Sequence, residues 1–240
     1  MKLRIRNDGP ASGAVNMQID SDLLANHKPE DDPILRIYTW NPYAVSRGYH
    51  QKVDSFNHDA IESKGYGLVR RATGGRAILH AQELTYAIIG SSPSELFGNT
   101  LHDTYMLINV ALIRFLQGMG LDPDISDGET LTEARASICF KSAGKHEITV
   151  QGKKIIGSAQ RRSHGVFLQH GSILCGSAHA QLTDLLNEDA PGKLSVAEIE
   201  KSTTNLNELT DTDYQRDYEE LAKELINSFA NTLNLEISAF

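Results

Sequence analysis

The stretch RRATGGRAILHAQELTY, from Arg70 to Tyr86, joins two adjacent arginines to a paired-glycine turn, a third arginine and an apolar strand. Gly74 and Gly75 have no Cβ, so they tolerate positive φ and allow successive backbone N–H groups to converge on a ligand oxygen. Because successive side chains of a strand point to opposite faces, only part of the arginine charge can point into one site. The stretch therefore predicts either a site that holds an acyl carbonyl or an anion near the backbone, or a solvated hairpin.

Hydrophobic periodicity on both sides of this stretch predicts strands in the middle of the chain and helices towards both ends. Strands are expected at residues 3–6, 33–40, 68–72, 77–80, 84–89, 146–150, 153–159 and 165–175. Helices are expected at 13–26, at 55–63 with Ser55 as the N-cap, at 99–119, at 178–186 and in a last segment whose apolar face carries Tyr214, Tyr218, Leu221, Leu225 and Phe229. This order predicts an α+β fold, with helices packed on a mixed, largely antiparallel sheet. No repeat or low-complexity linker interrupts the pattern, so residues 1–240 are predicted to form a single domain.

The composition narrows the class of protein. Of the 240 residues, 40% are hydrophobic, which suffices for one generous core. The 23 basic and 31 acidic residues give a formal net charge of −8, which argues against a nucleic-acid-binding protein with a broad basic surface. No apolar run could span a bilayer, and the N-terminal segment lacks the apolar core of a secretory signal. Two cysteines cannot build a disulfide framework, so we expect a protein of the reducing cytoplasm with neither nucleic-acid nor membrane partners.

A second candidate stretch is GKKIIGSAQRR, residues 152–162. Strand alternation implies that only one of Lys153 and Lys154 points inward. Gly157, Ser158 and Ala159 are small enough for a ligand chain to pass close to the strand. The alternative is an exposed edge strand whose small residues lie under a crossing helix.

A third candidate is Cys139 in the segment ASICFKS. A cysteine between two apolar residues is usually a small buried hydrophobe, and Cys175 is expected to be core for the same reason. Lys154 lies fifteen residues after Cys139, across a hairpin that could bring its ammonium group near the thiol and favour the thiolate. The histidines, His80, His146 and His170 among them, have no spacing typical of a metal site or a catalytic triad, so no metal is expected.

Taken together, these motifs resemble the lipoate-protein ligase and octanoyltransferase family. RRATGGRAILHAQELTY, KIIGSAQRR and GVFLQHGSIL follow one another in the family's order, and the resemblance runs from about residue 10 to residue 235. It implies a fold similar to the catalytic domain of biotin protein ligases.

The resemblance also favours one branch of the family. Where ATP-dependent ligases usually carry a third glycine, this chain has Arg76, and no trace of their extra C-terminal domain follows Phe240. Octanoyltransferases of the ligase-like branch have a nucleophilic cysteine ahead of the lysine motif, as Cys139 is, whereas Cys175 does not match the motif of the other branch. Ala81 departs from the acidic residue that relatives often have after the histidine, which leaves a carboxylate role at that position open.

The resemblance implies that Cys139 and Lys154 are catalytic and that octanoyl is transferred from acyl carrier protein to a lysine of a lipoyl domain through a cysteine thioester. Neither ATP nor another cofactor is needed, since a thioester is already activated. The acceptors implied are the lipoyl domains of 2-oxoacid dehydrogenases or the glycine cleavage H protein. The residues expected to bind substrate are Arg70, Arg71, Thr73, Gly74, Gly75, Arg76, His80, Gly157, Ser158 and Ala159.

Three alternatives stay open on the sequence. The first is an amidotransferase that moves octanoyl or lipoyl between lipoyl-domain proteins, again through a cysteine. The second is an ATP-dependent lipoate-protein ligase, in which Lys154 would contact the adenylate and Cys139 would be core. The third is a non-catalytic acyl-binding module that kept the fold.

Overall fold

The computed structural model describes residues 1–126, 147–190, 193–211, 213 and 217–240. Cys139, which carries the predicted nucleophile, lies outside the described residues, as do His146 and Tyr214.

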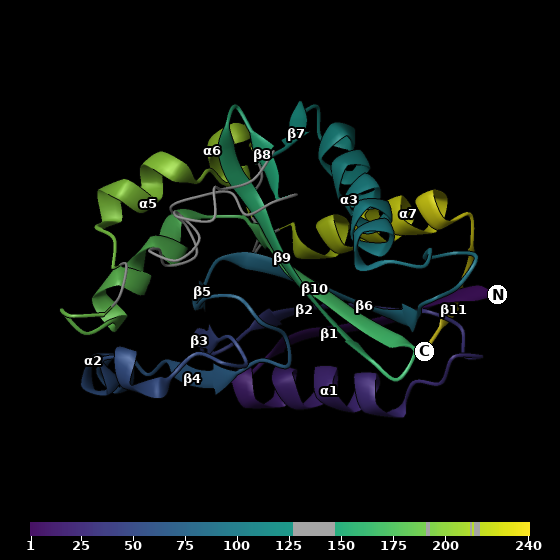
Figure 1. The fold of residues 1–240 in the computed structure, drawn as a ribbon. Coiled ribbons are helices and arrows are strands. Elements are labelled where there is room, and N and C mark those ends of the chain that lie inside the picture. Colours follow the sequence, from purple (N-terminus) through teal and green to yellow (C-terminus); the bar gives the residue numbers. More distant parts are fainter. Residues whose placement is uncertain (127–146, 191–192, 212, 214–216) are drawn as a thin grey trace.

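Within the described residues, eight strands form one mixed sheet in the order β11-β1-β2-β6-β10-β9-β8-β7 (Figure 1). β1 pairs in parallel with β2 and β11, and every other neighbouring pair is antiparallel. The bounds are β1 Lys2–Ala11, β2 Ile34–Trp40, β6 Glu83–Ser91, β7 Pro123–Ile125, β8 Ile148–Val150, β9 Lys153–Ser163, β10 Val166–Leu174 and β11 Glu236–Ala239. The predicted α+β fold with a mixed, largely antiparallel sheet is confirmed.

A second sheet, of three strands, holds the arginine and glycine stretch. Its order is β4-β3-β5, with bounds β3 Ala44–Arg47, β4 Gly67–Arg70 and β5 Ile78–His80. β3 lies between β4 and β5, parallel to the first and antiparallel to the second. The glycine turn therefore connects two strands that are not neighbours, so the hairpin interpretation of this stretch is wrong.

Long helices cover both faces of the large sheet. α1 (Gly13–Asn26) lies on one face, and α3 (Leu101–Gly118) and α7 (Tyr218–Leu233) lie on the other (Figure 1). Ser12 caps α1, and Thr100 forms a capping box with Asp103 at the start of α3, so both helices begin where side chains can accept the first free N–H groups. The predicted helix at 13–26 is confirmed to the residue.

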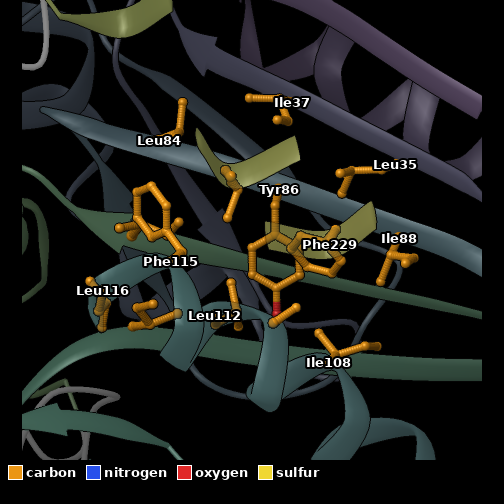
Figure 2. Packing of buried hydrophobic residues seen from close by; sticks show 14 of the residues in the cluster. Leu35, Ile37, Leu84, Tyr86, Ile88, Ile108, Leu112, Phe115, Leu116 and Phe229 are labelled. Atoms are coloured by element: carbon orange, nitrogen blue, oxygen red, sulfur yellow. The ribbon is translucent and has the colours of Figure 1, made fainter. Parts of the chain in front are cut away.

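The main core lies between the sheet and the pair α3 and α7 (Figure 2). Leu84, Tyr86 and Ile88 of β6 point to this side, where Phe229 of α7 and Leu112 of α3 pack against them. The alternate residues of β6 belong to a second cluster beneath α1. Because β6 is buried on both faces, its sequence is a nearly continuous apolar run.

Short helical segments differ from the sequence expectations. Residues Ser177–Leu185 form a 3-10 helix (η2) in place of an α-helix, and α2 (His58–Ser63) is capped by Asn57, whose side chain accepts the Ala60 N–H at 3.0 Å. Ser55 ends a separate 3-10 turn, η1 (Val53–Ser55), so its predicted capping role is wrong. Two helices, α5 (Val196–Ser202) and α6 (Leu206–Leu209), lie in a stretch for which no element was predicted. Among the described helices, none has the length and apolar character needed to cross a membrane.

Candidate active site

A cavity of about 200 Å³ opens beside the glycine turn, where β9, β10 and the small sheet meet. Its apolar lining comes from Met17, Tyr38, Trp40, Ile78 and Leu174, and its glycine and alanine lining from Gly75, Gly157, Ala159 and Gly171. The polar lining comprises Arg71, Arg76, His80, Thr85, Glu147, Lys154, Ser158, His170 and Ser172. An apolar cavity with a few convergent polar groups is the usual form of a small-molecule site.

Most of the predicted site residues meet in this cavity. Those that line it are Arg71, Gly75, Arg76, His80, Lys154, Gly157, Ser158 and Ala159. Arg70 is exposed and does not line the cavity, Thr73 is buried behind the wall, and Gly74 is exposed.

Arg71 shapes the glycine turn from within the protein. Its guanidinium donates to the carbonyl oxygens of Gly74 (2.8 Å), Arg76 (2.7 Å) and Ser46 (2.9 Å). Gly75 has φ +88°, a conformation that glycine adopts without strain. Because these hydrogen bonds fix the carbonyl groups of the turn, Arg71 stabilises the turn and also lines the cavity.

Lys154 is the inward-pointing member of the lysine pair, as strand alternation predicted. Its side chain is buried, with 3% of the residue exposed, while Lys153 is only partly buried. The ammonium group forms an ion pair with the Glu147 carboxylate, and the Thr204 N–H fixes the Lys154 carbonyl at 2.9 Å. A Cβ at Gly157 would lie 2.8 Å from Cε and 2.9 Å from Nζ of Lys154. A glycine is therefore what leaves room for the lysine in the cavity.

His80 belongs to a buried chain of hydrogen bonds. Nδ1 lies 2.6 Å from Glu83 Oε1 and Nε2 lies 2.7 Å from Ser46 Oγ. Burial lowers the pKa of His80, more than the Glu83 carboxylate raises it, so the imidazole is neutral. The network then assigns the proton to Nδ1, which donates to Glu83, while Nε2 accepts from Ser46. Trp40 stacks on the ring at 3.8 Å and fixes its plane.

Glu83 stays ionised although it is buried. Burial raises its pKa, but the hydrogen bonds from His80, Ser172 and Thr85 outweigh burial, and the pKa lies below its ordinary value. The backbone of Gln82, at φ +51°, makes the tight turn that lets His80 and Glu83 face each other. Ala81 therefore does not remove a carboxylate from this histidine, because Glu83 supplies one.

A second chain of the same type runs through His170. Nδ1 lies 2.9 Å from Asp20 Oδ2, and Nε2 lies 2.7 Å from Thr73 Oγ1. Asp20 also accepts from Arg36 at 2.7 Å and from the Tyr38 hydroxyl at 2.9 Å. Burial would raise the pKa of Asp20, but the hydrogen bonds and charges of His170 and Arg36 outweigh it and lower the pKa. The chain anchors the glycine turn, through Thr73, to helix α1.

The two remaining groups are Tyr86 and Cys175. The Tyr86 hydroxyl lies 2.7 Å from Ser158 Oγ, and burial raises its pKa to about 12, so it stays protonated near neutral pH. Cys175 is fully buried, and burial raises the pKa of its thiol well above the ordinary value. The predicted core role of Cys175 is confirmed.

The sequence interpretation missed the carboxylates of Asp20, Glu83 and Glu147. Glu83 carried a usable signal, since it follows His80 by three residues, between two predicted strands. Asp20 carried none, because its partner His170 is 150 positions away. The sequence spacing indicated neither a metal site nor a catalytic triad at His80 and His170, and it did not show that each of them joins a hydroxyl to a carboxylate.

Chemically, the cavity offers a buried ammonium group, glycine backbone and fixed hydrogen-bond donors around an apolar space. That combination suits an acyl chain whose carbonyl develops negative charge. Among the described His, Cys, Asp and Glu residues, no group of three is arranged to hold a metal ion.

Comparison with known sequences gives consistent matches. The family model for the lipoyl protein ligase A/B catalytic domain matches residues 12–230. The octanoyltransferase LipM of Staphylococcus aureus is 36% identical, over 96% of this chain and 87% of that protein. The LipM octanoyltransferases of Anoxybacillus flavithermus and Bacillus subtilis are 34% and 38% identical, over 99% and 76% of this chain and 88% and 68% of their own lengths.

Solved structures show the same fold. A crystal structure of lipoate-protein ligase A bound with ATP superposes with a TM-score of 0.82 at 23% identity, covering 100% of this chain and 89% of that one. A bipartite lipoate protein ligase from Thermoplasma acidophilum gives a TM-score of 0.77 at 22% identity, covering 100% of this chain and 87% of that one.

Proposed function

Because the chain belongs to the lipoyl protein ligase A/B catalytic domain family, we propose that it is an octanoyltransferase of lipoate biosynthesis, which moves octanoyl from acyl carrier protein to a lipoyl-domain lysine. The observation that carries the proposal is the match, over nearly the whole chain, to proteins named octanoyltransferases. Residues 1–240 would act as one acyltransferase domain in the cytoplasm. The acceptors would be lipoyl domains of 2-oxoacid dehydrogenases or the glycine cleavage H protein.

Cys139 is the proposed nucleophile. Its thiolate attacks the thioester carbonyl, the carbon–sulfur bond of the donor breaks, and the donor thiol leaves with a proton. The acceptor amine then attacks the new thioester, loses a proton, and releases the cysteine. Of the two cysteines, Cys175 is unsuited to this role because it is fully buried and its thiol pKa is raised.

The described residues next to the 127–146 segment support a role for Cys139 in this cavity. The Ser126 N–H donates to the Glu147 carbonyl at 2.9 Å, and Glu147 lines the cavity beside Lys154. Cys139 precedes Glu147 by eight residues, a length of chain that spans at most about 28 Å. The thiol is thus within reach of the cavity by chain length alone.

Lys154 and the glycine turn are proposed to stabilise the developing oxyanion. The ammonium group is held in the cavity by Glu147 and by its fixed backbone, so it needs little reorganisation during the reaction. Backbone N–H groups around Gly75 would add hydrogen bonds to the same oxygen. Arg71, His80 and His170 would keep the turn and the cavity wall in place.

The test is acyl-enzyme formation. Octanoyl-acyl carrier protein, incubated with the enzyme without acceptor or ATP, should add one octanoyl group that neutral hydroxylamine removes and that maps to Cys139 by peptide mass spectrometry. Cys139→Ser should lose both the adduct and transfer, because a serine alkoxide is far less accessible near neutral pH. Cys175→Ala is the matched control and should retain the adduct.

Three results would contradict parts of the proposal. A label on Cys175, or full transfer by Cys139→Ser, would disprove the cysteine mechanism. Transfer that requires ATP and free lipoate would identify a ligase. Transfer only from an octanoylated lipoyl-domain protein would identify an amidotransferase and leave the role of Cys139 intact.

A further inference from the structure

A second cavity, of about 350 Å³, lies between α1 and the β9–β10 hairpin. Its charged and aromatic lining comes from His27, Tyr49, Arg70, Arg71, Arg161 and His164, and we call this cavity the basic groove. None of the described residues that line it is acidic, although the protein carries a net charge of −8. The groove therefore concentrates positive charge on a protein that is negative as a whole.

Two arginines share one aromatic ring in the groove. The guanidinium carbons of Arg70 and Arg161 lie 5.0 Å and 4.7 Å from the ring centroid of Tyr49. Neither arginine forms an ion pair with a carboxylate of the described residues. The two guanidinium carbons are therefore at most 9.7 Å apart, and an anion near both would be attracted by two positive charges. The planar guanidinium group of arginine can donate two hydrogen bonds to the oxygens of one phosphate group.

His27 is a buried side chain in the wall of the groove. Only 8% of the residue is exposed, and in the described part of the chain neither ring nitrogen has a hydrogen-bond partner. A buried polar atom without a partner is unfavourable, and such atoms in folded proteins are nearly always satisfied. Both nitrogens are closed to solvent, so a ligand oxygen in the groove would become a partner only after the ring moved towards it.

The basic groove continues from the active-site cavity along β9. Gly157 and Ala159 line the cavity, while Arg161 and Ser163, at the following alternate positions, line the groove on the same face of the sheet. Arg71 lines both spaces. Lys154 and Arg161 are seven residues apart, which is roughly 23 Å along a strand. An elongated ligand could therefore occupy both.

We propose that the basic groove binds the phosphate group of a phosphorylated pantetheine thioester, whose acyl group lies in the active-site cavity. The inference rests on the proposed function, since a thioester donor carries its acyl group on such an arm. The same chemistry is offered by a carrier protein and by coenzyme A. Arg70 and Arg161 hold the phosphate, and the uncharged part of the arm follows β9 to Lys154.

The experiment compares two minimal donors, octanoyl-4′-phosphopantetheine and octanoyl-pantetheine, with a lipoyl domain as acceptor. The phosphorylated donor should have a KM about 10-fold lower than the unphosphorylated one, as expected for hydrogen bonds between arginine and a charged phosphate. Arg70→Gln and Arg161→Gln should bring the ratio of the two KM values towards one. Arg114→Gln, an exposed arginine on α3, is the matched control and should leave the ratio unchanged. Equal KM values in the unmodified protein would overturn the proposal.

Calorimetric titration with 4′-phosphopantetheine separates this inference from the proposed function. Binding that weakens about 10-fold or more in Arg70→Gln, with no transfer from either donor, would support the groove and disprove the transferase. Octanoyl transfer with equal binding of the phosphorylated and unphosphorylated arms would support the transferase and disprove the phosphate site in the groove. Arg70 is exposed, so Arg70→Gln keeps the test valid if Arg161→Gln does not fold. Parallel assays with octanoyl-acyl carrier protein and octanoyl-coenzyme A show which donor supplies the phosphorylated arm, because the KM for that donor should rise in Arg70→Gln. An unchanged KM for both donors would refute the site.

Discussion

At the scale of single residues, buried carboxylates set the chemistry of the active-site cavity. Glu83, Asp20 and Glu147 pair with His80, His170 and Lys154 respectively. Both ring nitrogens of each histidine are within hydrogen-bond distance of a protein oxygen. The histidines are therefore suited to holding the glycine turn and the cavity wall, while the Lys154 ammonium group lines the cavity and is a hydrogen-bond donor.

Glu83→Gln should lower the free energy of unfolding by about 1–3 kcal/mol at pH 7, because the amide cannot accept the three hydrogen bonds that the carboxylate does. Burial raises the pKa of Glu83, but its hydrogen-bond donors lower it by more, so the folded-state pKa lies below the ordinary value of 4.5. A group with a lowered folded-state pKa stabilises the folded protein at pH values above its ordinary pKa. That stabilisation is lost as the pH falls through the folded-state pKa. Urea unfolding across a pH series should therefore show the difference between Glu83→Gln and the unmodified protein shrinking below pH 4.5.

Glu62→Gln, an exposed substitution on α2, is the control and should change the unfolding free energy by less than about 0.5 kcal/mol throughout. A Glu83→Gln difference that stays constant down to acid pH would show that the carboxylate is not ionised in the folded protein.

At the scale of elements, the glycine turn is positioned by the small three-stranded sheet. The segment that follows β3 runs against the turn, where the Tyr49 N–H donates to the Thr73 carbonyl at 2.9 Å. A Cβ at Gly48 would lie 1.8 Å from the Gly75 carbonyl oxygen, so the two backbones can approach only because this residue is glycine. The shape of the cavity wall thus depends on a residue outside the motif that first indicated the site.

Gly48→Ala should lower the free energy of unfolding by about 1–3 kcal/mol, the range for forcing extra volume into packed structure, and should raise the KM for donor by moving Gly75. Gly74→Ala is the matched control for stability, because a Cβ there meets nothing within 4 Å. Urea unfolding and steady-state transfer assays measure the two effects. Equal stability of the two variants would show that the turn moves without resistance.

At the scale of the whole molecule, the main core and the active-site cavity are built from different residues. The cluster that includes Leu112 and Phe229 fills the side of α3 and α7 (Figures 1 and 2). Among the described residues, no member of this cluster lines the cavity, whose lining includes Met17 of α1 and Ile78 and His80 of the small sheet. Damage to the α3 side should therefore reduce stability without altering the site.

Leu112→Ala should cost about 2–5 kcal/mol of stability, as is typical for removing a fully buried leucine, and should leave the KM for donor unchanged wherever the protein is folded. Val110→Ala, at a position 38% exposed on the same helix, should change stability far less. Chemical unfolding and transfer kinetics at low temperature test both variants. A change in KM for Leu112→Ala that, expressed as a free energy, is comparable with its loss of stability would mean that the main core and the cavity are coupled.

The sequence by itself determined the elements and residues that depend on neighbours along the chain. α1 and α3 followed from apolar spacing, and the inward direction of Lys154 followed from strand alternation, because these patterns repeat over two to four residues. The motifs around Gly75 and Gly157 indicated the cavity because small residues that leave room for a ligand are visible in the sequence. Ser55 was mistaken for a cap because Asn57, two residues later, competes for the same local role.

Only the tertiary structure decided which side chains meet across the sheet. Asp20 and His170 are 150 positions apart, and their contact depends on α1 packing over β10, which no local pattern encodes. The basic groove likewise joins His27, Tyr49 and Arg161 from three distant segments. Contacts of this kind depend on strand order and register, and those are fixed by burial of the whole core rather than by the residues that form the site.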